Sequence, residues 1–246
     1  MVRRLLTLLM LAGVLVAIPS SALAGPGDPD YNKPTEGECR NYGYQALGEP
    51  SESSAPVGCG QKHTAKVFKV FMLPTEYDWA TVTDAQLQAV VAGKCRPAYQ
   101  KWMGRKDTVI ALTAYSYGWF TPSADEIAAG ARWLRCDIVA YKSGALAPLT
   151  RNKIPMIPKP LTDSVRKCLN GANYFTTICT ARHQYRATGS FALAKGRYPS
   201  ATKFQRIAAD RCPRLVTTRA YLYQYPSKAQ WKSGYRVMVC YSKTTR

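Results

Sequence analysis

The chain has two histidines, His63 and His183, and their residue type and spacing make them the first candidates for a catalytic or metal-binding role. Each lies four residues after a cysteine, in the stretches Cys-Gly-Gln-Lys-His and Cys-Thr-Ala-Arg-His. Imidazole is a common zinc ligand, and it is also the side chain that most often transfers protons near neutral pH. Three interpretations are therefore open: half of a zinc site in each stretch, a split acid/base pair, or one structural element that occurs twice.

An acid/base pair of histidines among many lysines and arginines is what a metal-independent phosphodiester-cleaving enzyme uses. Against this, the two histidines occupy equivalent places in two similar stretches, and such residues usually share one local role. We therefore favour a structural role, in which each imidazole supports the start of the following strand. Other enzyme motifs, such as Gly-x-Ser-x-Gly, His-Glu-x-x-His or a P-loop, do not occur in the sequence.

The first residues predict export. Arg3 and Arg4 precede an apolar run, and the tripeptide Ala-Leu-Ala at 22–24 matches a small-x-small cleavage site. This pattern is typical of a signal peptide over residues 1–24, cleaved near Ala24, with the Sec and twin-arginine routes both open. Cleavage leaves 32 of the 34 Lys and Arg residues against 15 acids, and so a net charge of +17. Such a charge predicts anionic partners, and export predicts a secreted or cell-envelope protein.

Eight cysteines follow the predicted signal, in two sets of four. They are Cys39, Cys59, Cys95 and Cys136 in the first set and Cys168, Cys179, Cys212 and Cys240 in the second. An even number of cysteines in an exported chain favours disulfides, which leave no thiol for zinc or for nucleophilic catalysis. Four cysteines allow three pairings in each set, and we favour first with second and third with fourth. We expect no metal and no cofactor.

The sequence also repeats itself. Residues 121–136 and 225–240 align without a gap and share Pro, Ser, Gly, Arg and Cys at the same places. This similarity predicts two repeats, 39–142 and 164–246, joined by a proline-rich linker at 143–163. Residues 25–38 are expected to form a further linker after the signal.

Helix signals recur at matching places in the two repeats. Thr83 and Ser200 are N-cap residue types, and an apolar stripe at helical spacing follows each of them up to a cysteine. Prolines at 97 and 213 predict that these helices end just after that cysteine. Ser123-x-x-Glu and Ser227-x-x-Gln are capping boxes of two one-turn helices, which glycines at 130 and 234 are expected to end.

Strands fill the remainder of each repeat. Alternating patterns and β-branched residues predict strands at 67–73, 109–119, 132–141, 186–193, 215–225 and 236–241. The expected fold class is α+β, with two small repeated disulfide-stapled domains. Each domain has an antiparallel or mixed sheet, one main helix and a one-turn helix.

Together these motifs resemble the septum-formation domain family of exported and membrane-anchored actinobacterial proteins. The resemblance rests on Cys-x3-His before a strand, a cysteine that closes a helix, and a Pro-x7-Gly-x-Arg-x3-Cys ending. It covers residues 39–150 closely and 164–246 more loosely, so the chain is similar to a tandem pair. The resemblance implies an envelope role linked to division or wall growth, and it supplies no mechanism.

The family's usual motif is similar to Cys-x-x-Pro-His-x-x-Glu, and this chain departs from it twice in each copy. Lys62 and Arg182 stand where the family has proline, and Lys66 and Arg186 stand where it has the acid. A His–Glu pair therefore cannot form through these positions.

Aromatic residues line one face of a predicted strand in each repeat, because alternate residues of a strand point to the same side. Sugars stack on such rings, and a nearby arginine holds an anionic group. The candidate ligand-binding residues are Tyr117, Trp119, Arg132, Tyr221, Tyr223 and Arg236. The alternative, which we favour, is that these rings form the apolar face that packs against the helix.

The sequence thus favours an exported, non-enzymatic binding protein of the cell envelope. Its expected partner is an anionic wall polymer or an envelope or division protein, and its charge also permits contact with a membrane surface. Nucleic acid is disfavoured because no recognisable module accompanies the charge. The alternative is a secreted basic phosphodiester hydrolase with His63 and His183 as acid and base.

Overall fold

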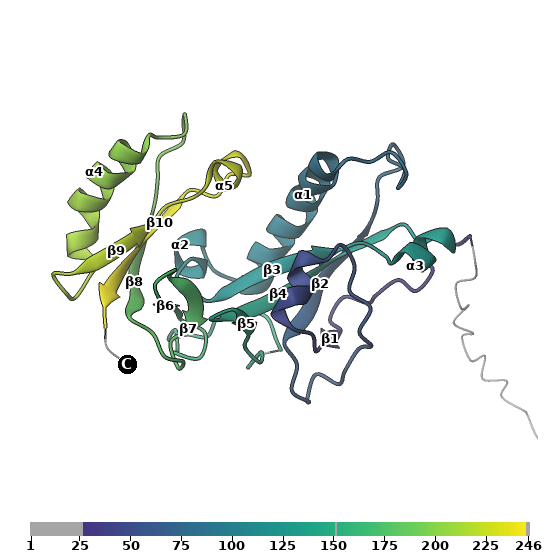
Figure 1. The fold of residues 1–246 in the computed structure, drawn as a ribbon, viewed down its shortest axis with the longest axis horizontal. Coiled ribbons are helices and arrows are strands. Elements are labelled where there is room, and N and C mark those ends of the chain that lie inside the picture. The colour runs from purple at the N-terminus through teal and green to yellow at the C-terminus, as the bar shows by residue number, and fades with distance from the viewer. Residues whose placement is uncertain (1–26, 151, 245–246) are drawn as a thin grey trace, which may run out of the picture.

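The computed structural model describes residues 27–150 and 152–244. The predicted signal peptide, residues 1–24, lies outside the described residues. Figure 1 shows two lobes side by side, an N-terminal half around α1 and a C-terminal half around α4. None of the helices in the described ranges is long and apolar enough to cross a membrane.

Both halves contain a strand, a main helix, a strand, a short helix and a strand, in that order. The first half comprises β1 (Cys39–Arg40), the 3-10 helix η1 (Tyr44–Gly48), β2 (Ala65–Met72), α1 (Asp84–Met103), α2 (Asp107–Ile110), β3 (Tyr115–Phe120), α3 (Ala124–Ala128), β4 (Trp133–Lys142) and β5 (Ala145–Leu146). The second half comprises β6 (Lys167–Asn170), β7 (Phe175–Ile178), β8 (Tyr185–Ala192), α4 (Ala201–Arg211), the 3-10 helix η2 (Cys212–Arg214), β9 (Tyr221–Gln224), α5 (Lys228–Lys232) and β10 (Val237–Lys243).

The strands form one antiparallel sheet in the order β1-β2-β4-β7-β6-β8-β10-β9, and β3 and β5 pair with β4 off this path. Within each half the last long strand is central: β4 pairs with β2 and β3, and β10 pairs with β8 and β9. The register breaks at the same place in both halves, next to Cys136 in β4 and next to Cys240 in β10. The architecture is α+β, as the sequence predicts. The domain boundaries 39–142 and 164–246 stay a prediction.

The predicted helix caps are present. Thr83 forms a capping box at the start of α1, and the Ser200 side chain accepts a hydrogen bond from a backbone N–H at the start of α4. Capping boxes also begin α3 and α5, as predicted. Gly130 and Gly234 follow these short helices with φ of 107° and 86°, a conformation that glycine adopts without steric cost.

The end of α1 differs from the prediction. Pro97 lies inside the helix, which continues to Met103 and is capped by Gly104 at φ 65°. Proline costs a helix interior about 3 kcal/mol. The extension, however, buries Tyr99 (8% exposed) and Met103 (0% exposed) in the first core. Burial of large apolar side chains stabilises by about 1.5–3 kcal/mol each, so the two together offset the cost of the proline.

The predicted strand 109–119 is also wrong in its first part. Residues 107–110 form α2, and β3 begins only at Tyr115. The carboxylate of Asp107 accepts hydrogen bonds from Arg96 Nη2 at 3.0 Å and from Gln100 Nε2 at 2.7 Å, both on α1. These contacts stabilise a helical turn at 107–110, although the β-branched residues of this segment favour a strand. The predicted strand 215–225 is shorter in the structure, where β9 begins at Tyr221.

Both segments that the sequence predicts to be linkers pack against the first half. Met156 and Ile157, from the segment 143–163, are 0% exposed and belong to the first core. Near the N-terminus, Trp133 Nε1 on β4 donates a hydrogen bond to the Tyr31 carbonyl at 2.9 Å. These segments therefore enlarge the first half.

The sheet face toward each main helix is apolar. Leu134, Cys136 and Ile138 of β4 pack in the core under α1. Met238 and Cys240 of β10 pack in the corresponding core under α4.

The opposite sheet face, here called the back face, is closed in the first half by its own N-terminal segment. β4 presents Arg135 and Asp137 on this face, 1% and 0% exposed. Glu52 forms an ion pair with Arg135 at 2.5 Å, and the Tyr42 hydroxyl donates to Asp137 Oδ2 at 3.1 Å. The loop between Cys39 and Cys59 thus covers this face through buried charges.

The back face of the second half is closed by the first half. Val239 and Tyr241 of β10 cluster with Ala111 and Leu112, which follow α2 directly. The backbone N–H of Lys167 on β6 donates to the Leu112 carbonyl at 2.8 Å. The two halves therefore pack together through an apolar contact next to α2.

Candidate functional site: a cleft between the two halves

Four disulfides link the cysteines of the described chain, and none is free. They join Cys39 to Cys59, Cys95 to Cys136, Cys168 to Cys179 and Cys212 to Cys240. This confirms the pairing that the sequence favours. Such bonds persist in oxidising compartments such as the outside of a cell.

Each histidine is held in a turn before the long strand β2 or β8. His63 is 2% exposed and His183 is 3% exposed. Nδ1 of His63 lies 2.7 Å from the Gln61 carbonyl, and Nδ1 of His183 lies 2.7 Å from the Ala181 carbonyl. Nε2 of His63 also lies 2.7 Å from Asn152 Oδ1. The two rings make the same local contact and share no partner among the described residues. This geometry supports a structural element that occurs twice.

The ligand atoms of Cys168, Cys179 and His183 lie within 4.8 Å of one another and are buried. The two sulfurs are bonded to each other, however, whereas zinc binds thiolates. This trio therefore lacks the donors of a zinc site while the disulfide is intact.

Lys66 and Arg186 both make polar contacts within the described chain. Lys66 and Arg186 each pair across the sheet with the first cysteine of their half, so the two positions match in register. Lys66 Nζ donates to the Gly37 carbonyl at 2.9 Å, and desolvation lowers its pKa. Arg186 forms an ion pair with Asp163.

The predicted aromatic residues mostly face the helices. The Tyr117 ring lies 5.1 Å from the Tyr99 ring and 5.9 Å from the Phe68 ring, under α1. Tyr221 and Tyr223 pack against the second core. Ligand binding through these tyrosines stays a prediction, while their packing follows the alternative that the sequence favours.

Trp119 lies with Tyr117 along an open groove beside η1. The charged residues of this groove are Glu49 and Asp84. Two carboxylates without a cation repel an anionic ligand, so the groove does not fit the expected partner.

Both predicted arginines donate hydrogen bonds to backbone carbonyls. Arg132 donates to the Tyr77 carbonyl at 2.6 Å. Arg236 donates to the Gly234 carbonyl at 3.3 Å, and its guanidinium lies 4.9 Å from the centre of the Trp231 ring. The described structure shows no contact between these arginines and the tyrosines of the candidate set.

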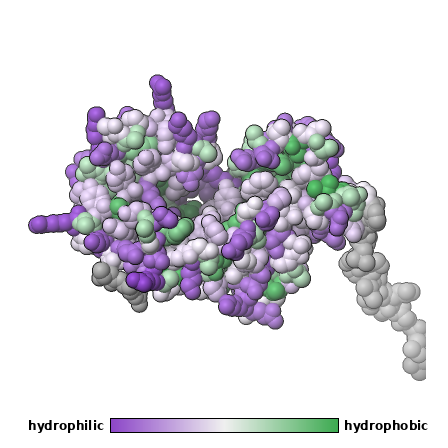
Figure 2. Space-filling view, in the orientation of Figure 1, coloured by the Kyte–Doolittle hydropathy of each residue, from purple (hydrophilic) through white to green (hydrophobic). Residues whose placement is uncertain are grey.

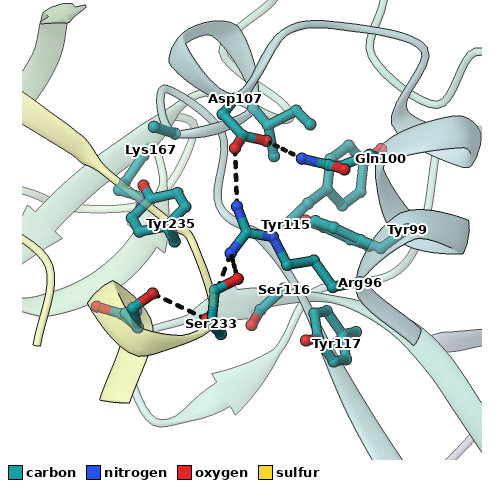
Figure 3. Close-up of a pocket in the computed structure, with 13 residues that line it drawn as sticks. Arg96, Tyr99, Gln100, Asp107, Tyr115, Ser116, Tyr117, Lys167, Ser233 and Tyr235 are labelled. Atoms are coloured by element: carbon teal, nitrogen blue, oxygen red, sulfur yellow. Dashed lines mark hydrogen bonds and ion pairs between the residues drawn. The ribbon is translucent and has the colours of Figure 1, made fainter. Parts of the chain in front are cut away.

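A cleft of about 210 Å³ lies where the two halves meet. Figure 2 shows the hollow between the lobes, and Figure 3 shows the side chains around it. α1, α2 and β3 form the wall of the first half, and β6 with the end of α5 forms the wall of the second. The lining residues are Arg96, Tyr99, Gln100, Asp107, Ile110, Ala111, Tyr115, Ser116, Tyr117, Lys167, Gln230, Ser233 and Tyr235.

Arg96 spans the cleft (Figure 3). Its Nη2 forms an ion pair with Asp107 at 3.0 Å, within the first half. Its Nη1 donates to the carbonyl of Ser233 and, at 3.3 Å, to the Ser233 hydroxyl, in the second half. The guanidinium also lies 5.8 Å from the centre of the Tyr235 ring. Because one side chain contacts both walls, it fixes their spacing.

Lys167 brings a second positive charge to the cleft. Its side chain is half-buried, and desolvation lowers its pKa to about 8. Within 27–150 and 152–244 its ammonium has no hydrogen bond and no ion pair, whereas Arg96 and Asp107 neutralise each other. The cleft therefore holds one cation without a counter-ion.

Tyrosines supply the aromatic part of the wall. Burial raises the pKa of Tyr99 and of Tyr117, and it raises the pKa of Tyr235 to about 12. Their hydroxyls therefore remain protonated near neutral pH. The Tyr99 hydroxyl is buried, and the described part of the chain offers it no hydrogen-bond partner. A buried hydroxyl without a partner costs about 1–3 kcal/mol.

Of the cleft residues, sequence reasoning found only Tyr117. Arg96 and Lys167 come from different halves and meet only because the halves pack together. Their sequence signal is weak: each is a charged residue directly beside a buried cysteine, Arg96 after Cys95 and Lys167 before Cys168.

The fold and the four disulfides define the class of the protein. It is a disulfide-bonded α+β protein of the extracellular space or the cell envelope. A family model described as septum formation matches residues 111–240, more than half of the chain. The chain therefore belongs to the septum formation family. The match is one span that starts after α2 and ends at Cys240, so a tandem pair of family domains stays a proposal. No curated protein and no solved structure matches the chain.

Proposed function

We propose that this protein is a non-enzymatic binding protein of the cell envelope, linked to septum formation or wall growth, whose ligand is an anionic wall polymer. The observation that carries the proposal is the cleft between the halves. There Lys167 offers a desolvated positive charge that no acid of the described residues neutralises, among aromatic and hydroxyl groups that suit a sugar-based polymer.

The overall charge supports the same ligand class. The chain carries 34 Lys and Arg residues against 15 acids, and Arg206 and Arg211 are exposed on α4. Such a surface attracts a polyanion over a distance of about 10 Å at 0.1 M salt. This long-range attraction brings the polymer to the protein surface. The Lys167 ammonium in the cleft then binds one unit of the polymer.

The histidine positions support binding rather than hydrolysis. A hydrolase that uses His63 and His183 needs both imidazoles at one phosphodiester. Each ring instead bonds within its own turn, and His63 has both nitrogens occupied.

Co-sedimentation with purified bacterial cell walls across a salt series tests the proposal. The oxidised protein is compared on intact walls and on walls stripped of anionic polymer. We expect retention on intact walls that persists at moderate salt and is lost on stripped walls. Equal retention on both preparations would contradict a polymer ligand and indicate an envelope protein as the partner.

A further inference from the structure

We propose that the cleft between the halves binds one sugar unit that bears an anionic group, and that the Lys167 ammonium pairs with that anion. This inference rests on the proposed binding function and names the ligand unit and its contacts. The cleft volume of about 210 Å³ sets the size of the ligand. Sites for drug-sized molecules have about 300–1,000 Å³, so this cleft fits a single unit of a polymer.

The charge balance of the cleft selects an anion. Its charged side chains are Arg96, Asp107 and Lys167, and the first two form an ion pair. One positive charge is left over, on a side chain that burial has already desolvated. An ion pair formed there is stronger than one on the open surface, because less water screens it.

The neutral groups of the cleft select a sugar. Tyr99, Tyr117 and Tyr235 place aromatic rings in the wall, against which the C–H face of a sugar packs. Ser116 and Gln230 add polar groups that hydrogen-bond with hydroxyls.

The basic surface around α4 provides a contrast. Arg197, Lys203 and Lys228 line a concave area there. Lys203 and Lys228 are exposed, so salt and water screen their attraction for any anion. Specific recognition therefore belongs to the cleft, and Lys203 is a suitable control position.

The inference predicts a pH dependence. The titratable residues that line the cleft with Lys167 are Arg96 from α1, Asp107 from α2, Tyr99 from α1, Tyr115 and Tyr117 from β3, and Tyr235 after α5. Burial places the pKa of Lys167 at about 8 and that of Tyr235 at about 12. Binding needs the protonated amine, so the affinity for glucuronate, which stays ionised throughout, falls by about tenfold between about pH 7 and about pH 9. A glucosyl phosphate shows the same fall above about pH 7, where its second phosphate proton, with a pKa of about 6, is already lost.

Isothermal titration calorimetry on the oxidised full-length mature protein tests the inference. The probes are a glucosyl phosphate and glucuronate, with glucose and inorganic phosphate as the neutral and sugar-free comparisons. The variants are Lys167→Gln, Lys167→Arg and the control Lys203→Gln, each checked by its melting curve. Lys167→Arg keeps the charge and should bind with little pH dependence, since arginine does not titrate in this range.

We expect at least one anionic sugar to bind about tenfold more tightly than glucose and than inorganic phosphate, with the affinity lost in Lys167→Gln and kept in Lys203→Gln. Preference for the glucosyl phosphate indicates a phosphodiester polymer, and preference for glucuronate indicates a uronic acid polymer. Equal binding by Lys167→Gln, equal binding of inorganic phosphate, or no binding of either sugar would overturn the inference.

Cell-wall co-sedimentation of Lys167→Gln separates this inference from the proposed function. If the wild type and Lys167→Gln are retained equally, the binding function stands and the cleft is not its site. If the wild type is not retained, the wall-binding function itself falls, whatever the calorimetry shows.

Discussion

The back faces of the two halves occupy the same place in the same topology, yet they are built from opposite chemistry. Arg135 directly precedes Cys136 on β4, and Val239 directly precedes Cys240 on β10, next to the same break in register. The first back face is held by buried charges to its own N-terminal loop. The second is apolar and is covered by the residues after α2, which belong to the other half.

The difference follows from the loop between the first two cysteines of each half. Cys39 and Cys59 are separated by 20 residues, and this loop contains η1 and Glu52. Cys168 and Cys179 are separated by 11 residues, and the shorter loop forms the β6–β7 hairpin. From this hairpin Leu169 joins the apolar cluster on the back face of β10, and Ala111 and Leu112 of the first half complete it. This contact between the two halves places the walls of the cleft opposite each other.

The largest expected loss of stability comes from placing an arginine in the second half at the position that matches Arg135 of the first half. Val239→Arg buries a guanidinium against Ala111 and Leu112, with no carboxylate to pair with it. We expect the free energy of unfolding to fall by about 5 kcal/mol, from an unpaired buried charge and overpacking together. Urea denaturation under oxidising conditions measures it. The control Thr202→Arg, at an exposed position of α4, should change stability by less than about 0.5 kcal/mol. A loss of similar size in both variants would contradict the assignment of this face.

The reverse change removes the charge from the first half. Arg135→Met leaves Glu52 and Asp137 buried without their main cation. We expect a loss of about 3–4 kcal/mol in the same urea assay. Adding Asp137→Leu should recover part of this loss, because it removes one of the stranded charges. A double variant less stable than the single one would show that the charges do not act as a network.

Smaller effects are expected at the repeated histidines. His63→Ala removes contacts to Gln61 and Asn152, and His183→Ala removes only the contact to Ala181. We expect losses of about 2 and about 1 kcal/mol respectively, at roughly 1 kcal/mol per hydrogen bond. Thermal melting measures both. Unchanged melting in either variant, together with loss of a phosphodiesterase activity, would instead support the hydrolase alternative.

The smallest effect concerns pH. Desolvation raises the pKa of Asp137 from 3.8 to about 6, against the opposing effect of Arg135. The folded state therefore binds this proton more tightly than the unfolded state, so its contribution to stability is present in acid and is lost as pH rises through about 6. Between about pH 7.5 and pH 5 we expect a relative gain of roughly 1 kcal/mol in the wild type that Asp137→Asn lacks. The exposed Asp125→Asn should keep the wild-type pH profile, and an Asp137→Asn profile that matches it would contradict the assignment.

Much of the local structure follows from the sequence because its causes are local. The capping serines, the glycines after α3 and α5, and the cysteine pairing all depend on residues a few positions apart or on matched spacing in the two halves. The second half's shorter β9 and the extension of α1 past Pro97 depend on tertiary packing. The turn at Asp107 depends on Arg96 and Gln100 of α1.

Sequence patterns do not predict the cleft, because it also depends on tertiary packing. No spacing rule connects Arg96 with Ser233, because the two residues meet only when the residues after α2 pack against β10. Arg132 and Arg236 repeat in the alignment, yet each donates to a backbone carbonyl, Arg132 to that of Tyr77 and Arg236 to that of Gly234. The residues that repeat in the two halves are those that both halves need in order to fold. The residues that line the cleft differ between the halves.

The most direct test of the account is competition between a small ligand and the wall. Wild-type protein bound to intact walls is titrated with whichever anionic sugar binds the cleft, at constant ionic strength. The account predicts that saturation of the cleft releases the protein, while neutral glucose at the same concentration does not. Full retention on the wall with the cleft saturated would contradict the claim that this cleft is where the protein holds its polymer.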